Sequence, residues 1–281
     1  MNKDNLPNIG TVALVEIDGL AIRYARAGVS KGIPILLTAP WPESIYSFHR
    51  LAPQLAAEHP VILVDLPGFG LSQSRPDVMA PEAMGDFFIK LLRHFDISRT
   101  HVVAPDVGTL AVLFANSKQK DFFESLVIGG AAMQADLADG ALKDLIYSPS
   151  GFLTNAGSDG IKPYLEHAAI ITPAAIIEDF RAASAGRRLE EATQFVRAYI
   201  QDCPKLEPQL STIKTPALII AGKNDKIVPP VNGQFLADRL PNNTYLLLNA
   251  EHRIWEEAAS EYIEALTSWF GGDYRLLEKA L

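Results

Sequence analysis

The segment THVVAPDVGT, residues 100–109, has the pattern of a sharp turn between a strand and a helix. A β-branched run precedes Asp106, and the small residues Ala104 and Gly108 stand where two backbones would pass closely. The familiar version of this turn exposes a serine above a sheet. A carboxylate there can instead displace a leaving group from an sp³ carbon and form an alkyl-enzyme ester. The segment thus indicates epoxide or carbon–halogen opening, with an ordinary helix N-cap as the alternative.

Two later residues could complete this chemistry. Asp225 follows the expected strand 216–221, and His252 follows the expected strand 244–249. Ligands of parallel α/β sheets bind at the carboxyl ends of strands. We therefore expect Asp225 to hold one ring nitrogen of His252, while the other nitrogen faces Asp106 across a water-sized gap and acts as a base. The alternatives are a surface turn for Asp225 and a solvated loop for His252.

Strand and helix patterns alternate through the first 130 residues and again after residue 213. The expected strands are 11–16, 20–27, 33–38, 61–65, 100–104, 125–129, 216–221 and 244–249, and the expected helices are 43–59, 81–95, 110–116, 231–240 and 255–270. Such alternation predicts an α/β fold with a mostly parallel, doubly wound sheet.

The pattern changes to helical periodicity alone between residues 131 and 212. Since strands resume afterwards, we predict an α/β core of residues 1–130 and 213–281 with an inserted helical cap, residues 131–212. A separate helical domain is the alternative. The carboxyl ends of the strands, with Asp106, Asp225 and His252, would then face the cap.

Composition narrows the class of protein. With 48% hydrophobic and 21% charged residues over 281 positions, the chain can form a large globular core. A net charge of -8 argues against a nucleic-acid partner, and no apolar run approaches the ~18–20 residues of a membrane span. The single cysteine, Cys203, excludes an internal disulfide and a multi-cysteine metal site, and suits the cytoplasm. We expect no cofactor and no metal, and the sequence leaves a homodimer open.

Four motifs together resemble a known family. They are APWP at 39–42, DLPGFGLS at 65–72, the turn with Asp106, and the late Asp225 and His252. Their order over residues 11–270 resembles the α/β-hydrolase superfamily, specifically its Asp-nucleophile branch of epoxide hydrolases and haloalkane dehalogenases.

The resemblance implies a role for each catalytic residue. Asp106 would be the nucleophile, Asp225 the orienting acid and His252 the base. It also implies an oxyanion hole from the backbone N–H groups of Trp41 and Val107. Pro40 and Pro42 lack an N–H, so Trp41 is the only donor in its short loop.

The chain also departs from this branch. The first motif usually begins His-Gly, and here it reads Ala39-Pro40. The residue after the nucleophile is commonly a tryptophan that binds the departing halide, and here it is Val107. This change weakens the dehalogenase interpretation.

Epoxide hydrolases use cap tyrosines that bind and protonate the epoxide oxygen. Tyr199 is the best candidate for that role, with Tyr164 or Tyr147 as its companion. Trp41, Tyr147 and Tyr164 would also contact the substrate. For any single tyrosine, packing in the cap core is the alternative.

The leading hypothesis is a hydrolase that opens a small hydrophobic epoxide through an Asp106 ester, which water activated by His252 then hydrolyses. The alternatives are a haloalkane dehalogenase, an enzyme of this fold that uses Asp106 and His252 as acid and base without a covalent step, and a non-catalytic small-molecule binder.

Overall fold

A computed structural model describes residues 6–278 of the chain. Eight strands form one sheet in the order β1-β2-β4-β3-β5-β6-β7-β8. The strands are β1 Thr11–Ile17, β2 Leu20–Gly28, β3 Ile35–Thr38, β4 Pro60–Val64, β5 Thr100–Pro105, β6 Phe123–Gly129, β7 Ala217–Gly222 and β8 Asn243–Leu248. The pairs β1–β2 and β2–β4 are antiparallel, and all other neighbours are parallel. The prediction of a mostly parallel α/β sheet is confirmed.

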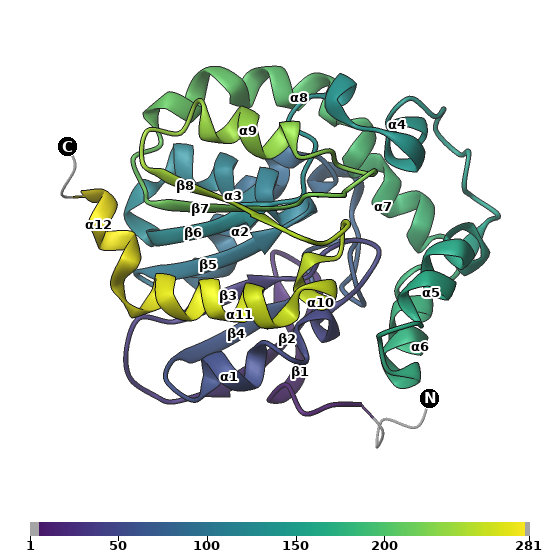
Figure 1. Cartoon of the computed structure of the whole chain (residues 1–281). Coiled ribbons are helices and arrows are strands. Elements are labelled where there is room, and N and C mark those ends of the chain that lie inside the picture. Colours follow the sequence, from purple (N-terminus) through teal and green to yellow (C-terminus); the bar gives the residue numbers. More distant parts are fainter. Residues whose placement is uncertain (1–5, 279–281) are drawn as a thin grey trace.

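Helices cover both faces of the sheet (Figure 1). On one face lie α2 Pro81–His94, α3 Val107–Lys118, α8 Tyr199–Leu206 and α9 Val231–Ala237, and on the other lie α1 Ala52–Ala56, α11 Ala259–Ser268 and α12 Tyr274–Glu278. Every residue of β5 and β6 is buried, as expected for strands between two helical layers. Asp106 of the candidate site directly follows the carboxyl end of β5.

Two expected helices are interrupted. The expected helix 43–59 is replaced by a short 3₁₀ helix, η2 Ile45–Phe48, followed by α1. Pro53 lies in the first turn of α1, where its missing N–H is tolerated. In the interior of a helix that began before α1, the same proline would remove a backbone hydrogen bond. The expected helix 255–270 is divided into α10 Ile254–Glu257 and α11 by the non-helical backbone of Ala258.

The described residues between β6 and β7 contain helices and turns, and no strand. The helices are η5 Ala135–Leu137, α4 Gly140–Ile146, η6 Gly157–Ile161, α5 Lys162–Ala168, α6 Ala174–Ala183, α7 Arg188–Arg197, α8 and η7 Glu207–Thr212. In Figure 1, α5 and α6 stand away from the sheet, whereas α8 lies along its helical layer.

The DLPGFGLS motif forms a tight turn around a buried carboxylate. Asp65 accepts hydrogen bonds from the backbone N–H groups of Ile45 at 2.8 Å and Leu71 at 2.9 Å. A Cβ at position 70 would lie 2.0 Å from the Asp65 carboxyl carbon, so the backbone approach requires Gly70. The motif therefore anchors the loop that runs from β3 to η2.

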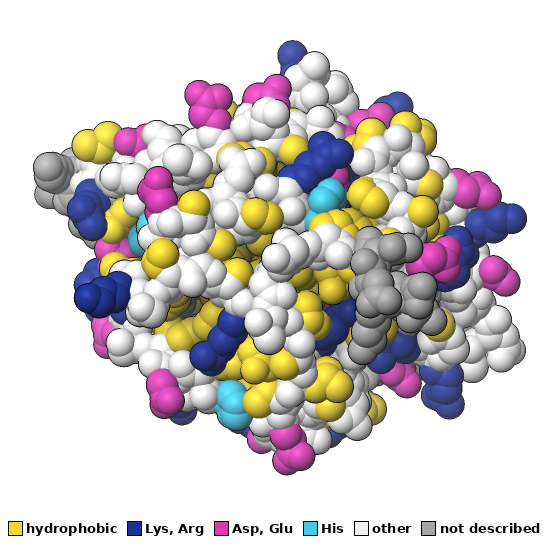
Figure 2. All heavy atoms as spheres, turned by 90° about the horizontal axis from the view of Figure 1, so that it is seen from below, with side chains coloured by type: hydrophobic (Ala, Val, Ile, Leu, Met, Phe, Trp, Pro, Cys, Tyr) yellow, Lys and Arg dark blue, Asp and Glu magenta, His cyan; other side chains and the backbone are white. Residues whose placement is uncertain are grey.

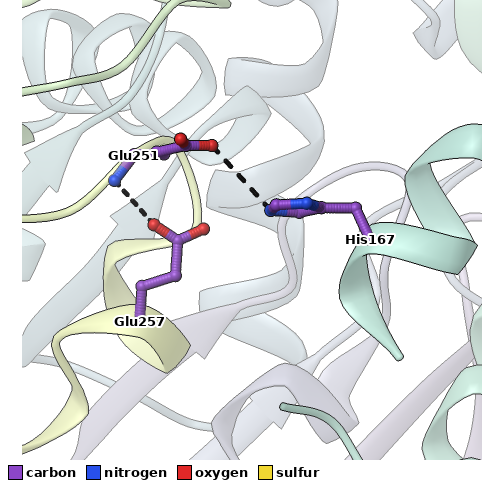
Figure 3. A group of neighbouring side chains, drawn as sticks. All are labelled: His167, Glu251 and Glu257. Carbon is purple, nitrogen blue, oxygen red and sulfur yellow. Dashed lines mark hydrogen bonds and ion pairs between the residues drawn. The ribbon is translucent and has the colours of Figure 1, made fainter. Parts of the chain in front are cut away.

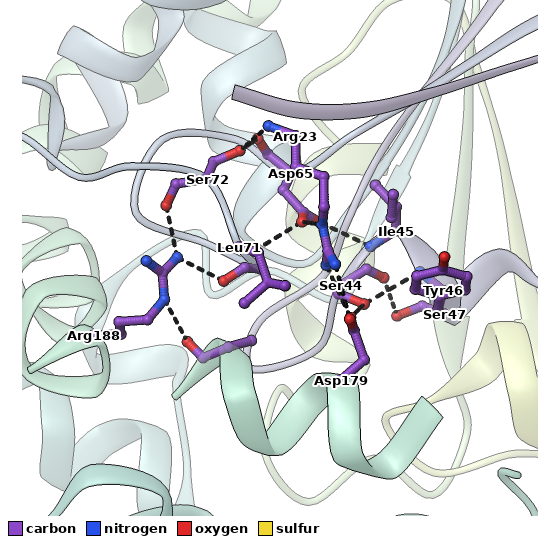
Figure 4. Close-up of polar contacts among 12 residues, drawn as sticks. Arg23, Ser44, Ile45, Tyr46, Ser47, Asp65, Leu71, Ser72, Asp179 and Arg188 are labelled. Carbon is purple, nitrogen blue, oxygen red and sulfur yellow. Dashed lines mark hydrogen bonds and ion pairs between the residues drawn. The ribbon is translucent and has the colours of Figure 1, made fainter. Parts of the chain in front are cut away.

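A buried arginine joins this turn to α6 (Figure 4). Arg23 of β2 donates through Nε to Asp65 and through both terminal nitrogens to Asp179 of α6, at 2.8 and 2.9 Å. Ser44 donates to the same Asp179 carboxylate at 2.6 Å. Such bidentate pairs fix orientation as well as distance. The network thus ties α6 to the core.

Two features bear on possible partners: the helices and the distribution of side chains on one face. Within residues 6–278 no helix combines the length and the hydropathy that crossing a bilayer requires. Figure 2 shows a face on which hydrophobic side chains gather toward the middle and most charged side chains lie toward the rim. A homodimer, the lack of a nucleic-acid partner and the cytoplasmic location remain predictions from sequence.

Candidate active site

Asp106 sits at a strained turn between β5 and α3. Its φ of 55° lies in the left-handed region, which side chains other than glycine rarely adopt. The turn is crowded: a Cβ at position 108 would lie 2.1 Å from Oγ1 of Thr38 and 3.1 Å from Cβ of Ala104. Gly108 is therefore required by space, as expected from the sequence pattern. This geometry projects the Asp106 carboxylate beyond the end of the sheet.

The two oxygens of Asp106 have different partners. Oδ1 accepts the backbone N–H groups of Val107 at 2.5 Å and Trp41 at 3.2 Å. These are the two donors expected for the oxyanion hole. In the free protein, the Asp106 carboxylate itself occupies them. An ester formed on Oδ2 would leave its carbonyl oxygen in the same place, where the donors can stabilise negative charge.

His252 lies between two carboxylates. Its Nδ1 is 2.7 Å from Oδ2 of Asp225, and its Nε2 is 3.1 Å from Oδ2 of Asp106. Asp225 is in turn held by the N–H groups of Ile227 and Val228, both at 2.8 Å to Oδ1. The prediction of a water-sized gap between His252 and Asp106 is wrong. With no substrate between them, the two side chains make a direct charge-assisted contact.

The flanking charges also set the protonation of His252. Burial lowers the pKa of His252, but the negative charges and hydrogen bonds of Asp225 and Asp106 outweigh it and raise the pKa to about 10. His252 is therefore an imidazolium in the free protein at neutral pH. As an imidazolium, His252 can donate a proton. It can act as a base only after it has donated that proton and one neighbouring carboxylate has lost its negative charge.

A cavity of about 230 Å³ opens above these groups. Its lining is Trp41, Pro42, Asp106, Ala141, Leu142, Leu145, Gly160, Ile161, Pro163, Tyr164, Ile227 and His252. No Lys or Arg is among these lining residues, so the cavity suits a small, neutral and largely apolar molecule.

Known proteins share this fold. A sequence profile for the family described as alpha/beta hydrolase fold matches residues 33–162. A proposed epoxide hydrolase from Pseudomonas aeruginosa is 16% identical with a TM-score of 0.80, covering 95% of this chain and 97% of that one. An enol-lactonase from Burkholderia xenovorans LB400 is 17% identical with a TM-score of 0.76, covering 92% and 100%.

The protein has the α/β-hydrolase fold. The profile and the solved structures agree on this fold, and they do not select one activity, because an enol-lactonase and an esterase stand among the similar structures beside the proposed epoxide hydrolase. A curated relative is the dihydrolipoyllysine-residue acetyltransferase component of an acetoin cleaving system from Pseudomonas putida, 24% identical over 253 residues. That alignment covers 88% of this chain and 65% of the relative, so the chain spans less than two thirds of that protein.

The three candidate tyrosines of this chain have different surroundings. Tyr164 of α5 lines the cavity, but its hydroxyl donates to Oε1 of Glu43 at 2.6 Å. Tyr199 is buried and is also absent from the cavity lining. Burial together with the charge of Asp106 holds its pKa well above 10, so it stays protonated. Tyr147 is 53% exposed, donates to Asp136 at 2.8 Å and is absent from the cavity lining. The structure therefore does not support the predicted substrate contact of Tyr147.

Sequence reasoning missed two charged residues at the site. Glu43 is completely buried two positions after Trp41, and Arg253 directly follows His252. The Nε of Arg253 donates to Oε1 of Glu43 at 2.5 Å. Their positions beside known motif residues were the available signal, but a charged residue in a loop is more often solvated.

One further cluster lies at the surface beside the catalytic loop (Figure 3). His167 of α5, Glu251 before His252 and Glu257 of α10 have potential ligand atoms within 4.8 Å of one another. His167 and Glu251 are more than half exposed, and Glu257 already accepts the backbone N–H of Glu251 at 2.6 Å. None of the three residues lines the cavity.

Proposed function

We propose that this protein opens a small hydrophobic epoxide through a covalent ester on Asp106. The observation that carries the proposal is that the two oxygens of the Asp106 carboxylate have different partners. Oδ1 is held by two backbone N–H groups, while Oδ2 lies beside His252 at an apolar cavity. This arrangement suits attack of a carboxylate on carbon, followed by hydrolysis of the resulting ester.

The first half-reaction forms the ester. Oδ2 of Asp106 attacks an epoxide carbon, and the carbon–oxygen bond of the ring breaks. The released alkoxide takes a proton from the hydroxyl of Tyr199, our candidate acid, and the tyrosine is restored by the proton of the His252 imidazolium. His252 is then neutral because it has given up its proton. It stays neutral because the ester on Asp106 no longer carries the negative charge that raised the pKa of His252.

The second half-reaction releases the product. Neutral His252 removes a proton from water as the water oxygen attacks the carboxyl carbon of Asp106. The N–H groups of Val107 and Trp41 stabilise the oxyanion at Oδ1. Collapse releases the diol with Oδ2, and its alcohol takes the proton of the newly added hydroxyl. Asp106 is again a carboxylate and His252 an imidazolium, so charge and protons balance.

Residues 131–212 act in this proposal as the cap that supplies the apolar wall of the cavity. Ala141, Leu142, Leu145, Ile161 and Pro163 are cap residues whose apolar side chains reach the lining. The lining holds no Lys or Arg, and the His252 imidazolium is already paired with two carboxylates, so the cavity favours a neutral substrate.

The test is capture of the ester. A panel of styrene-type and aliphatic epoxides, with short haloalkanes beside it, first identifies a substrate. His252→Gln should then be alkylated without turnover, so that the peptide carrying Asp106 gains the mass of one substrate, whereas Asp106→Asn gains nothing. A single wild-type turnover in heavy-oxygen water should label the Asp106 carboxylate.

Other outcomes identify the alternatives. Turnover of haloalkanes alone, with the same adduct, indicates a dehalogenase. Label in the product alone with no adduct contradicts the ester and indicates acid–base chemistry by Asp106 and His252. No turnover with tight binding of the panel indicates a non-catalytic binder.

A further inference from the structure

The most enclosed charge beside the site is Glu43, which the reaction above does not use. Its exposed fraction is 0%, and three donors from distant parts of the chain converge on its carboxylate. Oε1 accepts Nε of Arg253 at 2.5 Å and the hydroxyl of Tyr164 at 2.6 Å, and Oε2 accepts Nε1 of Trp255 at 2.9 Å.

Glu43 and the residues that contact it are each close, in the chain or in space, to a residue of the candidate site. Glu43 is two residues from Trp41, whose N–H binds Asp106. Arg253 is the neighbour of His252, and the Trp255 ring meets the imidazole edge to face, with centroids 6.1 Å apart. Tyr164 belongs to α5 and forms part of the cavity wall.

The carboxylate is ionised in this setting. Burial raises the pKa of Glu43, but the positive charge of Arg253 and the hydrogen bonds that the carboxylate accepts hold it below its usual value. The pKa of Tyr164 is well above 10 because of burial and the negative charge of Glu43. Tyr164 therefore keeps its proton and directs it at Glu43.

We propose that Glu43 is the positioning residue that sets the oxyanion loop, the His252 loop and α5 relative to one another, and that it withdraws the Tyr164 hydroxyl from proton donation to substrate. Tyr164 then serves as a wall of the cavity, and Tyr199 alone remains as the tyrosine acid. This second part rests on the proposed function, whereas the positioning of Trp41 and His252 does not.

Glu43→Gln is the direct test because it keeps the shape and removes the charge. A glutamine has one acceptor oxygen, and its NH₂ group must face a donor from Trp255 or Arg253, so one buried donor loses its partner. Glu124→Gln is a matched control. Glu124 is a buried glutamate that accepts the hydroxyl of Tyr274 at 2.6 Å and pairs with Arg99. It lies at the start of β6, opposite the end that supports Asp106.

The first measurement needs no substrate. We expect the NMR signals of the Trp41 backbone N–H and the His252 ring nitrogens in the free protein to move in Glu43→Gln and to stay in place in Glu124→Gln. Unmoved signals in Glu43→Gln, or equal changes in both variants, overturn the positioning role. If Glu43→Gln does not fold, Tyr164→Phe removes one hydroxyl donor of Glu43 and keeps the ring, and the Trp41 N–H signal should still move.

The second measurement uses a substrate from the panel. Glu43→Gln should lower kcat about 10²-fold, because a misplacement of about 1 Å has that effect. Tyr199→Phe should lose at least ~10²-fold, as expected for a lost general acid. Tyr164→Phe, which keeps its ring in the cavity wall, should lose much less than Tyr199→Phe. A loss in Tyr164→Phe equal to that in Tyr199→Phe overturns the withdrawal of Tyr164. If no epoxide is turned over, the proposed function fails and the NMR measurement still decides the positioning role.

Discussion

Nε2 of His252 lies 3.1 Å from Oδ2 of Asp106, with no space for water between the two atoms. In the proposed reaction, attack on a substrate carbon must break this contact, since the same oxygen forms the new bond. The contact is then the resting state of that reaction, in which the proposed nucleophile is held by the proposed base. Four predictions follow from this contact and from the packing around it.

The stability of the protein should depend on pH through His252. Its pKa is raised from 6.5 to about 10 on folding, so its stabilising contribution is complete below pH 6.5 and is lost as pH rises through 10. Between pH 7 and 9 the free energy of unfolding should fall by roughly 1.4 kcal/mol per pH unit. Urea denaturation at several pH values measures this slope, and His252→Gln should flatten it. An equal slope in that variant contradicts the assignment.

Asp225→Asn should impair the base without disturbing the fold. The two N–H bonds to Oδ1 of residue 225 can persist, but an amide no longer fixes the tautomer or balances the charge of His252. We expect kcat to fall about 10⁴-fold, with the Asp106 adduct accumulating. Mass spectrometry of a quenched reaction measures this, and Asp136→Asn, at an exposed position, is the control. Equal activity of the two variants would mean that another acid orients His252.

Gly108→Ala should destabilise the turn at Asp106. The added Cβ would lie 2.1 Å from Oγ1 of Thr38, and overpacking of this kind costs about 1–3 kcal/mol. Gly271→Ala, where no atom lies within 4 Å of the added Cβ, is the matched control. The double variant with Thr38→Ala should recover part of the loss in urea denaturation. The absence of any recovery would place the cost in the backbone and not in this contact.

Asp179→Asn should loosen the attachment of α6. Arg23 would lose one of its two buried carboxylate partners, and breaking a buried ion pair costs about 3–5 kcal/mol. Its neighbour Glu178 is largely exposed and pairs with Arg181 at 3.4 Å, so Glu178→Gln should change stability by less than 1 kcal/mol. Chemical denaturation of both variants gives the comparison. Similar losses would show that the buried pair contributes no more than a surface one.

Local sequence carried much of the catalytic interpretation. The spacing of Ala104, Asp106 and Gly108 predicts the turn because the need for small residues there is a short-range steric effect. The strand and helix periodicities predict the parallel sheet, and the ends of its strands carry Asp225 and His252. These inferences need only neighbours in the chain and the rule that parallel strands end at one edge.

Tertiary structure decided what surrounds those residues. Glu43 meets Tyr164, Arg253 and Trp255 across 121, 210 and 212 positions, and no periodicity predicts such contacts. The same holds for Tyr147, which follows the last residue of α4 and is exposed. Helical spacing defines which residues share a face, but only packing against the rest of the chain decides whether that face meets solvent, a core or a cavity. The fold also sets the protonation of His252, because its raised pKa depends on two carboxylates that only the fold brings to its ring.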